Sequence, residues 1–311
     1  MTETRTAPGT GDTRGTAVDA LDRSAHERAD PDLLARTKAD ASTLVLVLRG
    51  DAAPLASAES LQWVSPRAVP SDAEWAFLGR DAAGSAVLAA VFGAAKGDDK
   101  PLFEAPAGWA GLRAVGGSLS ATEAGAFTEA LSLGRWLRDA PFCPACGERA
   151  DVIASGWSRR CPRCKREHFP RTDPAVIVAV GSRTHPDRLL LGSNVLWAAE
   201  RFSCFAGFAE AGESLEDAVV REVKEECGID VVDVRYRGSQ AWPYPRSLMV
   251  GFLANAADDA AALADGDEIA YVRWFTRDEI GAALAGEGDI LLPGPASISR
   301  RLIVDWHTGA A

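Results

Sequence analysis

Short apolar runs separated by Gly, Asp and Pro begin at Ser42 and continue along the rest of the chain. The runs in STLVLVLRG, EWAFLGRD and AVLAAVFG have the length and boundaries of strands. Phe127, Ala130, Leu131 and Leu137 follow a helical spacing, which predicts a helix over 119–139. Residues 41–140 are therefore expected to form a small α+β domain.

The second half of the chain shows the same mixture of patterns. Strands are expected in AVIVAVGSR, RLLLGSN, VVDVRYRGS, SLMVGFLANA and EIAYVRWFT, and helices over 277–285 and 295–307. Strands interleaved with helices of this length predict an α/β or α+β sandwich over residues 173–311.

Residues 1–40 lack this periodicity. They are rich in Thr, Asp, Arg, Ala and Gly, and we expect a mostly disordered tail with a helix near 30–38. No apolar leader is visible and the longest apolar runs are too short to span a bilayer, so we expect a cytoplasmic protein without a membrane partner. In that compartment the six cysteines are not expected to form disulfides.

The net charge of −11 disfavours general, charge-driven binding to nucleic acids or anionic membranes. One local basic run departs from this acidity. It could contact phosphate or RNA, but a solvated face is the favoured interpretation. The run comprises Arg159, Arg160, Arg163, Lys165, Arg166 and Arg171.

Four cysteines form two C-x2-C pairs: Cys143 with Cys146, and Cys161 with Cys164. Two such pairs can share one tetrahedral Zn²⁺, whereas redox dithiols or chance pairing are the alternatives. A complete set of four protein ligands leaves no open position, so the expected zinc is structural. We therefore expect a zinc ribbon over residues 141–172. Cys204 and Cys227 stand alone in apolar surroundings and are expected to be small core residues.

The stretch GFAEAGESLEDAVVREVKEECGID, residues 207–230, predicts a loop and then an amphipathic helix. Gly207 and Gly212 bracket the loop, Ser214 is the expected N-cap, and Gly228 is the expected left-handed end of the helix. Val219, Val220, Val223 and Cys227 share one face.

Glu222, Glu225 and Glu226 cluster on the adjacent face of this helix. Like charges at this spacing weaken a helix, and Arg221 cannot neutralise all three. A hard cation such as Mg²⁺ or Mn²⁺ would turn the repulsion into ligation. An acidic solvated face is the alternative, which the two bracketing glycines and Glu213 make less favourable.

Here the sequence resembles the Nudix hydrolases. Gly207, Glu213 and the run Arg221 to Ile229 match the Nudix box GX5EX7REUXEEXGU at every fixed position. The resemblance implies an α/β/α sandwich in which Glu222, Glu225 and Glu226 hold divalent metal and Arg221 orients the carboxylates. It also implies an outer role for Glu213, and a metal-side position for the Ala206 carbonyl and for Glu268.

The Nudix box alone does not identify the substrate. SQAWPYPRS, residues 239–247, is similar to the SQPWPFPxS motif of the NADH pyrophosphatase subfamily, which also has a four-cysteine zinc ribbon before its Nudix domain. Ala241 replaces Pro and Tyr244 replaces Phe. We expect the prolines to hold an extended, non-pairing segment whose aromatic wall and Gln240 lie against a dinucleotide base; an ordinary edge strand is the alternative. The expected substrate-binding residues of this stretch are Gln240, Ala241, Trp242, Pro243, Tyr244, Pro245, Arg246 and Ser247.

By the same resemblance, Phe169 stacks on adenine across a dimer interface, Phe208 takes the other stacking position, and Ser299 closes the substrate site. The implied reaction is metal-dependent hydrolysis of NAD(H) to AMP and nicotinamide mononucleotide by a homodimer. Removal of 5′ NAD caps from RNA uses the same chemistry and is the closest rival. A non-enzymatic ligand-sensing regulator is a further alternative, which intact Glu222, Glu225 and Glu226 disfavour. A zinc-ribbon adaptor with secondary catalysis is another.

Overall fold

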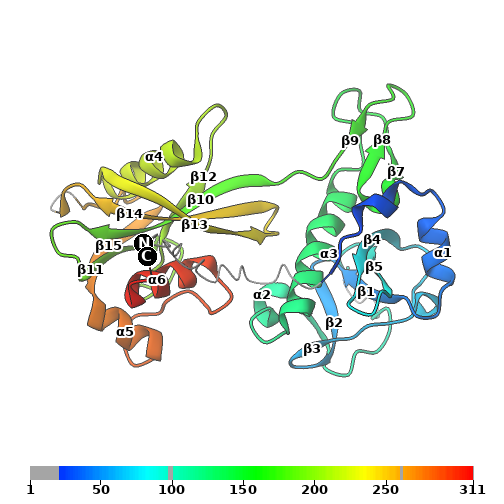
Figure 1. Cartoon of the computed structure of the whole chain (residues 1–311), viewed down its shortest axis with the longest axis horizontal. Coiled ribbons are helices and arrows are strands. Elements are labelled where there is room, and N and C mark those ends of the chain that lie inside the picture. Colours follow the sequence, from blue (N-terminus) through cyan, green and yellow to red (C-terminus); the bar gives the residue numbers. More distant parts are fainter. Residues whose placement is uncertain (1–20, 97–100, 260–261, 311) are drawn as a thin grey trace, which may run out of the picture.

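The computed structural model describes residues 21–96, 101–259 and 262–310. Figure 1 shows two lobes joined by the long chain segment that leads into strand β10 (Asp173–Ser182). The N-terminal domain and the zinc ribbon form one lobe, and the C-terminal sandwich forms the other. Within the described ranges, no helix is both long enough and apolar enough to cross a membrane.

The N-terminal domain is a six-stranded mixed sheet covered by helices. The strand order is β3-β2-β1-β5-β4, with β6 pairing with β2 and β1 running parallel to β5. Its elements are β1 (Leu44–Arg49), β2 (Ala52–Ser57), β3 (Ser60–Leu61), η2 (Pro66–Ala68), β4 (Glu74–Arg80), β5 (Ala86–Phe92), β6 (Trp109–Gly111), α2 (Leu112–Val115) and α3 (Ala121–Asp139).

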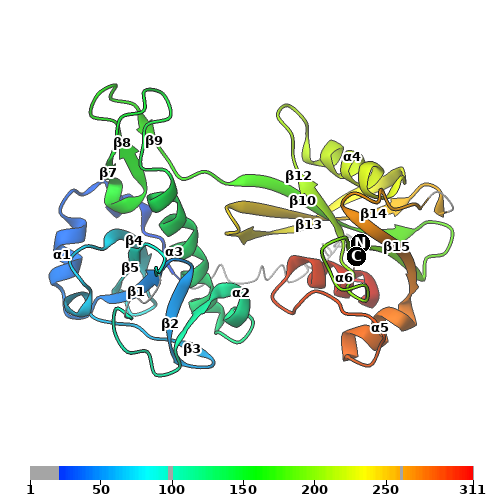
Figure 2. The same ribbon diagram turned by 180° about the vertical axis from the view of Figure 1, so that it is seen from behind.

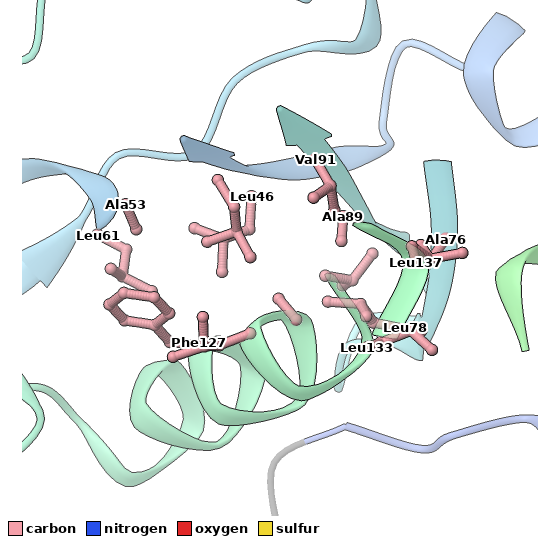
Figure 3. Close-up of a cluster of buried hydrophobic side chains, with 14 of the residues drawn as sticks. Leu46, Ala53, Leu61, Ala76, Leu78, Ala89, Val91, Phe127, Leu133 and Leu137 are labelled. Carbon is pink, nitrogen blue, oxygen red and sulfur yellow. The ribbon is translucent and has the colours of Figure 1, made fainter. Parts of the chain in front are cut away.

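Helix α3 packs its apolar side on one face of this sheet, as Figure 3 shows for Phe127, Leu133 and Leu137 against Leu46 and Leu78. All of these side chains are buried. The helix buries its three against the sheet because its apolar positions repeat every three or four residues and so share one face. Ser120 accepts a hydrogen bond from the Glu123 N–H and caps the helix. The predicted α+β domain is thus built around α3, although α2 was not predicted.

The prediction of a mostly disordered tail over 1–40 is wrong for residues 21–40, although the helix expected near 30–38 is confirmed by α1. Residues 1–20 lie outside the described residues, but η1 (Ala25–Ala29) and α1 (Leu33–Ala39) follow them. Leu33 is fully buried against the second face of the N-terminal sheet, where it contacts a cluster that includes Phe77. One buried leucine in a short polar segment leaves no periodic signal in the sequence, which is why this docking was missed.

Glu129 of α3 is buried beside Arg23, with 3.7 Å between Oε1 and the Arg23 Nη1. Burial nevertheless outweighs the attraction of Arg23 and Arg28 and raises the pKa of Glu129 from 4.5 to about 7. A raised pKa of an acid means that the fold favours the protonated form. Its contribution to stability is therefore complete below about pH 4.5 and is lost as the pH rises through 7.

We expect Glu129→Gln to stabilise the protein at pH 8 by on the order of 2 kcal/mol and by much less at pH 5, because the amide cannot ionise. Denaturant melts of both proteins at the two pH values measure this. An equal gain at pH 5 and pH 8 would show that packing, rather than charge, limits stability at this position.

The zinc ribbon is a small three-stranded sheet of β7 (Asp151–Ile153), β8 (Ser158–Arg160) and β9 (Glu167–His168), with η3 (Ala154–Gly156) in its first turn. It is anchored to the N-terminal domain. The Trp157 indole N–H donates to the Phe77 carbonyl at 2.7 Å, and Gly156 approaches Ala76 so closely that a Cβ would lie 2.6 Å from the Ala76 Cβ.

Arg159 belongs to this anchor, so both interpretations of the basic run are wrong for it. Its side chain is buried and donates to the carbonyls of Ala150 at 2.9 Å and Leu137 at 2.6 Å. Burial of such a charge is tolerated because these carbonyls satisfy it. Arg160, Arg163, Lys165, Arg166 and Arg171 are exposed, as expected of a solvated face.

The C-terminal domain is an α/β/α sandwich. Its sheet has the order β13-β14-β10-β11-β15, and β12 pairs with the first half of β10. The remaining elements are β11 (Arg188–Asn194), β12 (Phe205–Phe208), α4 (Leu215–Cys227), β13 (Val231–Trp242), β14 (Ser247–Ala256), β15 (Ile269–Thr276), α5 (Arg277–Ala285) and α6 (Ile298–Thr308).

Alternate residues of β10 supply the two cores of this sandwich. Val176 and Val178 face the cluster that contains Val219 of α4, whereas Ile177 faces the cluster that contains Leu302 of α6. Figure 2 shows α4 and α6 on opposite sides of the sheet. The sandwich expected from the sequence is confirmed.

Candidate functional site

The four cysteines of the ribbon converge on one point. Among the described residues they form the one cluster of three or more potential ligand side chains whose ligand atoms all lie within 4.8 Å of one another. The Sγ atoms of Cys143 and Cys164 are 3.6 Å apart, and those of Cys146 and Cys161 are 3.5 Å apart. Four thiolates about 2.3 Å from a tetrahedral Zn²⁺ lie about 3.8 Å from one another, so the cluster fits structural zinc.

The two knuckles have matching backbones. Gly147 donates to the Cys143 carbonyl and Lys165 to the Cys161 carbonyl, and both donors have positive φ, 73° and 63°. A hydrogen bond from the Cys164 N–H lowers the pKa of the Cys161 thiol, which favours the thiolate that zinc binds. His168 adds a contact that the sequence did not indicate, because its Nε2 lies 3.1 Å from the Cys143 Sγ.

The carboxylate helix of the C-terminal domain, α4, has the predicted ends. The Ser214 hydroxyl accepts a hydrogen bond from the Asp217 N–H, and Gly228 ends the helix at φ 73°. Val219, Val223 and Cys227 are fully buried, which aims the carboxylate face away from the core. Two details differ from the sequence prediction, because Gly207 lies in β12 rather than at the start of a loop and Val220 is exposed rather than on the buried face.

Arg221 organises the carboxylates beside it. Its Nη2 donates to Glu213 at 2.6 Å, and its Nη1 donates to Glu222 and Glu225, both at 2.9 Å. The same guanidinium donates to the Phe208 carbonyl at 2.8 Å, which ties α4 to the end of β12. Arg221 therefore fixes three glutamates and the main chain after the sheet in one arrangement.

Glu226 is left out of this network. Its side chain is buried, and Oε2 has no hydrogen-bond partner. Burial, together with the charges of Glu268 and Glu222, raises the pKa of Glu226 to about 8, although a hydrogen bond with the Ala206 backbone opposes this. A buried carboxylate oxygen without a partner is costly unless a cation completes it, so this position suits a divalent metal.

The Glu222 carboxylate packs directly against the backbone of Gly207. A Cβ at Gly207 would lie 1.9 Å from the Glu222 carboxylate carbon, so only glycine fits there. Asp265 fixes the turn that carries Glu268, because its Oδ1 accepts from the N–H groups of Glu268 and Ile269 at 3.1 and 2.8 Å. The sequence did not single out Asp265, whose role depends on a turn that brings Glu268 towards α4.

The SQAWPYPRS stretch forms the tip of the β13–β14 hairpin. The expectation of a non-pairing segment is wrong for its first part, since Gln240 and Trp242 belong to β13 and pair with Met249 and Ser247. β13 is the edge strand of the sheet, and the two prolines occupy the turn beyond it. Prolines are tolerated there because no ladder N–H is needed in the turn.

Polar side chains of this hairpin tip form hydrogen bonds and an ion pair with neighbouring segments of the chain. The Gln240 amide donates to the Ala296 carbonyl at 2.7 Å and accepts from the Ile298 N–H at 2.8 Å, which fixes the start of α6. Arg246 pairs with Asp173 at 2.8 Å. Gln240 thus supports the wall of the expected site, and this support could not be read from a sequence separation of 58 residues.

Tyr244 reaches the N-terminal domain. Its hydroxyl accepts from the Arg113 N–H at 3.2 Å, and the Arg113 guanidinium carbon lies 3.9 Å from its ring centroid and 5.4 Å from that of Trp242. The rings of Trp242 and Tyr244 meet edge to face at 5.4 Å. The hydroxyl that distinguishes Tyr244 from the expected Phe therefore links the two lobes.

The other expected contacts are dispersed. Phe208 is 53% exposed at the end of β12, beside the carboxylates. Phe169 is 50% exposed and lines a hollow with Arg28 and Trp157, away from α4. Ser299 is buried, and its hydroxyl lies 2.8 Å from that of Ser203, so it contacts the segment that leads into β12. The structure thus gathers the metal-side residues but not all of the stacking residues.

Three family models match consecutive parts of the chain. The model described as "NADH pyrophosphatase-like rudimentary NUDIX domain" matches residues 15–136, "NADH pyrophosphatase zinc ribbon domain" matches 138–169, and "NUDIX domain" matches 171–291.

Two curated relatives are similar over most or much of the chain. The Mycobacterium tuberculosis H37Rv protein named "NAD-capped RNA hydrolase NudC" is 41% identical over 86% of this chain and 84% of its own length. The human protein named "NAD-capped RNA hydrolase NUDT12" is 38% identical over 60% of this chain and 42% of its own length. With the carboxylate helix and the cysteine cluster in place, the chain belongs to the Nudix hydrolases of the NADH pyrophosphatase type.

Proposed function

We propose that this protein hydrolyses the pyrophosphate bond of NAD(H), releasing AMP and nicotinamide mononucleotide, in the reduced form when NADH is the substrate. The observation that carries the proposal is the buried Glu226 carboxylate of helix α4, whose Oε2 has no hydrogen-bond partner and which lies near Glu222 and Glu268. Membership of the NADH pyrophosphatase type supports the choice of dinucleotide.

Glu222 and Glu226 would hold the divalent cation, Mg²⁺ or Mn²⁺, with Glu268 and the Ala206 carbonyl on the same side. When bound, such an ion neutralises the pyrophosphate oxygens and favours deprotonation of the attacking water. Arg221 and Glu213 keep the carboxylates in place through the contacts described above. Glu225, whose side chain is 60% exposed, serves as a further ligand or as the base that accepts the water proton.

Removal of 5′ NAD caps from RNA is the second candidate, favoured by the names of both relatives. The same bond is cut, so one active site suffices for both substrates. We further propose a homodimer, in which the half-exposed Phe169 of one copy stacks on the adenine bound by the other. The cytoplasmic location also stays a prediction.

The test is a panel of NADH, NAD⁺, ADP-ribose and 5′-NAD-capped RNA with purified protein and either metal, following AMP or 5′-phosphorylated RNA. Turnover of NADH separates the enzyme from a regulator or an adaptor. Relative kcat/KM values rank the substrates, because this ratio measures discrimination.

Trp242→Ala should raise KM for NADH about tenfold with little change in kcat, because a ground-state stacking contact is lost. Gln240→Ala should raise KM and also lower the melting temperature, because its amide fixes the start of α6. Steady-state kinetics and thermal melts of both variants test this. If both variants kept wild-type kinetics on every dinucleotide, SQAWPYPRS would be an ordinary edge strand without a role in substrate binding.

A further inference from the structure

The loop between β11 and β12 exposes apolar side chains that the reaction at the carboxylates does not require. All seven residues from 195 to 201 are exposed, including Val195 at 43%, Leu196 at 88% and Trp197 at 39%. Large apolar side chains gathered in a single exposed loop usually mark a binding surface.

The loop is held firmly despite its exposure. The Gly192 and Ser203 main chains exchange two hydrogen bonds of 3.0 and 2.9 Å at its base. Asn194 accepts from the N–H of Leu196 through its side chain and from that of Trp197 through its carbonyl. A loop fixed in this way can present a rigid surface, which lowers the entropy cost of binding.

Its position places it next to the metal-side carboxylates. The Val195 N–H donates to the Glu268 carbonyl at 2.9 Å. The turn that carries Glu268 contacts the carboxylate helix, because the Asp265 N–H donates to the Glu226 carbonyl at 3.3 Å and the Asp265 Oδ1 accepts from the Glu268 N–H at 3.1 Å. The loop then continues through Phe202, whose N–H donates to the Leu291 carbonyl, into β12 at the start of the Nudix box.

Two side chains at the tip of the loop are of the kinds that bind nucleotides. The Arg201 guanidinium carbon lies 5.1 Å from the centroid of the Trp197 ring, and among the described residues Arg201 forms no ion pair. A ring beside an unpaired guanidinium can stack on a base and attract its phosphate, and proteins bind single-stranded RNA with this pair of groups. Three apolar side chains are too few for the roughly 800 Å² per partner that a stable protein interface needs.

We infer that Trp197 and Arg201 bind the RNA body of a capped substrate, at the nucleotide that follows the NAD moiety. In a 5′ NAD cap the adenosine carries the pyrophosphate on its 5′ side and the RNA on its 3′ side. The phosphate of the next nucleotide is therefore only one nucleotide away from the pyrophosphate at the metal site. This inference rests on the proposed function and names the part of the substrate that free NADH lacks.

The test compares NADH with a 5′-NAD-capped, unstructured RNA oligonucleotide. Trp197→Ala should raise KM for the capped RNA about tenfold and leave kcat/KM for NADH within about twofold, since one base–aromatic stack is lost. Trp197→Phe should retain most of the affinity. Tyr236→Ala, which removes an exposed aromatic ring from β13, is the matched control and should change neither substrate.

Arg201→Ala should reduce the slope of log kcat/KM for capped RNA against log salt by about 0.7, the value for one phosphate contact on a single strand. Equal losses on both substrates, no loss on either, or a change of oligomeric state in Trp197→Ala would overturn the inference. Wild-type protein that cleaves NADH but not capped RNA would overturn it while leaving the proposed function intact. Failure on both substrates would instead refute the proposed function.

Discussion

Replacing Glu226 by Gln is expected to lower kcat on NADH by about a thousandfold, because a ligand that holds the charge-stabilising cation contributes several kcal/mol to the transition state. The variant keeps the shape of the side chain and should remain folded. Without metal it should melt at the same temperature or higher, because the amide removes a buried charge that Glu268 and Glu222 repel.

Glu222→Gln should show the same loss of kcat, and extra Mg²⁺ or Mn²⁺ should recover a small part of it in either variant. Glu216→Gln is the control, because Glu216 is exposed on the same helix outside the cluster. Near-normal kcat in folded Glu222→Gln and Glu226→Gln would mean that the helix face is merely acidic. The regulator or adaptor would then become the better account of the chain.

Cys161→Ser is expected to release zinc and to cause the largest loss of stability of any single change, because ribbon folding and metal binding share one free energy. Turnover per folded molecule should change far less, since the cysteine cluster lies in the zinc ribbon whereas the carboxylates lie on α4 of the C-terminal domain. Thermal melts and elemental analysis of zinc measure the two effects.

Cys227→Ser is the matched control for zinc content, because Cys227 is buried but lies outside the cysteine cluster. It should retain one zinc per chain. Native protein without stoichiometric zinc would show that the ribbon does not depend on bound metal. Cys161→Ser protein with unchanged zinc and stability would show the same.

Features encoded by short spacings were predictable from the sequence. The Ser214 cap and the Gly228 end of α4 lie within hydrogen-bonding reach of their own helix, so their signals are local. The cysteine knuckles are also local, because each closes a turn of only a few residues. For the same reason α3 and α5 begin and end close to the predicted residues.

Features that depend on distant partners were not predictable. Arg159 looks like one more exposed cation until the Leu137 carbonyl covers it, 22 residues away. Tyr244 reaches Arg113 across 131 residues, which links the substrate hairpin to a domain that had no assigned role. β12 was missed because its four residues are shorter than any pattern that distinguishes a strand from a loop.

The hairpin tip illustrates how much of a site depends on packing. Its composition indicated an aromatic surface, and the structure provides one in Trp242 and Tyr244. Composition alone could not show that the Gln240 side-chain amide hydrogen-bonds to the start of α6. Residues that look equivalent in a motif therefore divide into those that can contact a ligand and those that hold the neighbouring segments of the site in place.

The most direct test of the central claim is the release of AMP from NADH by purified protein with Mg²⁺ or Mn²⁺, measured beside Glu226→Gln and with a chelator. The account predicts AMP and reduced nicotinamide mononucleotide in equal amounts, formed only with metal and nearly abolished in Glu226→Gln. Wild-type protein that contains zinc and is folded, yet releases no AMP with either metal, would contradict it.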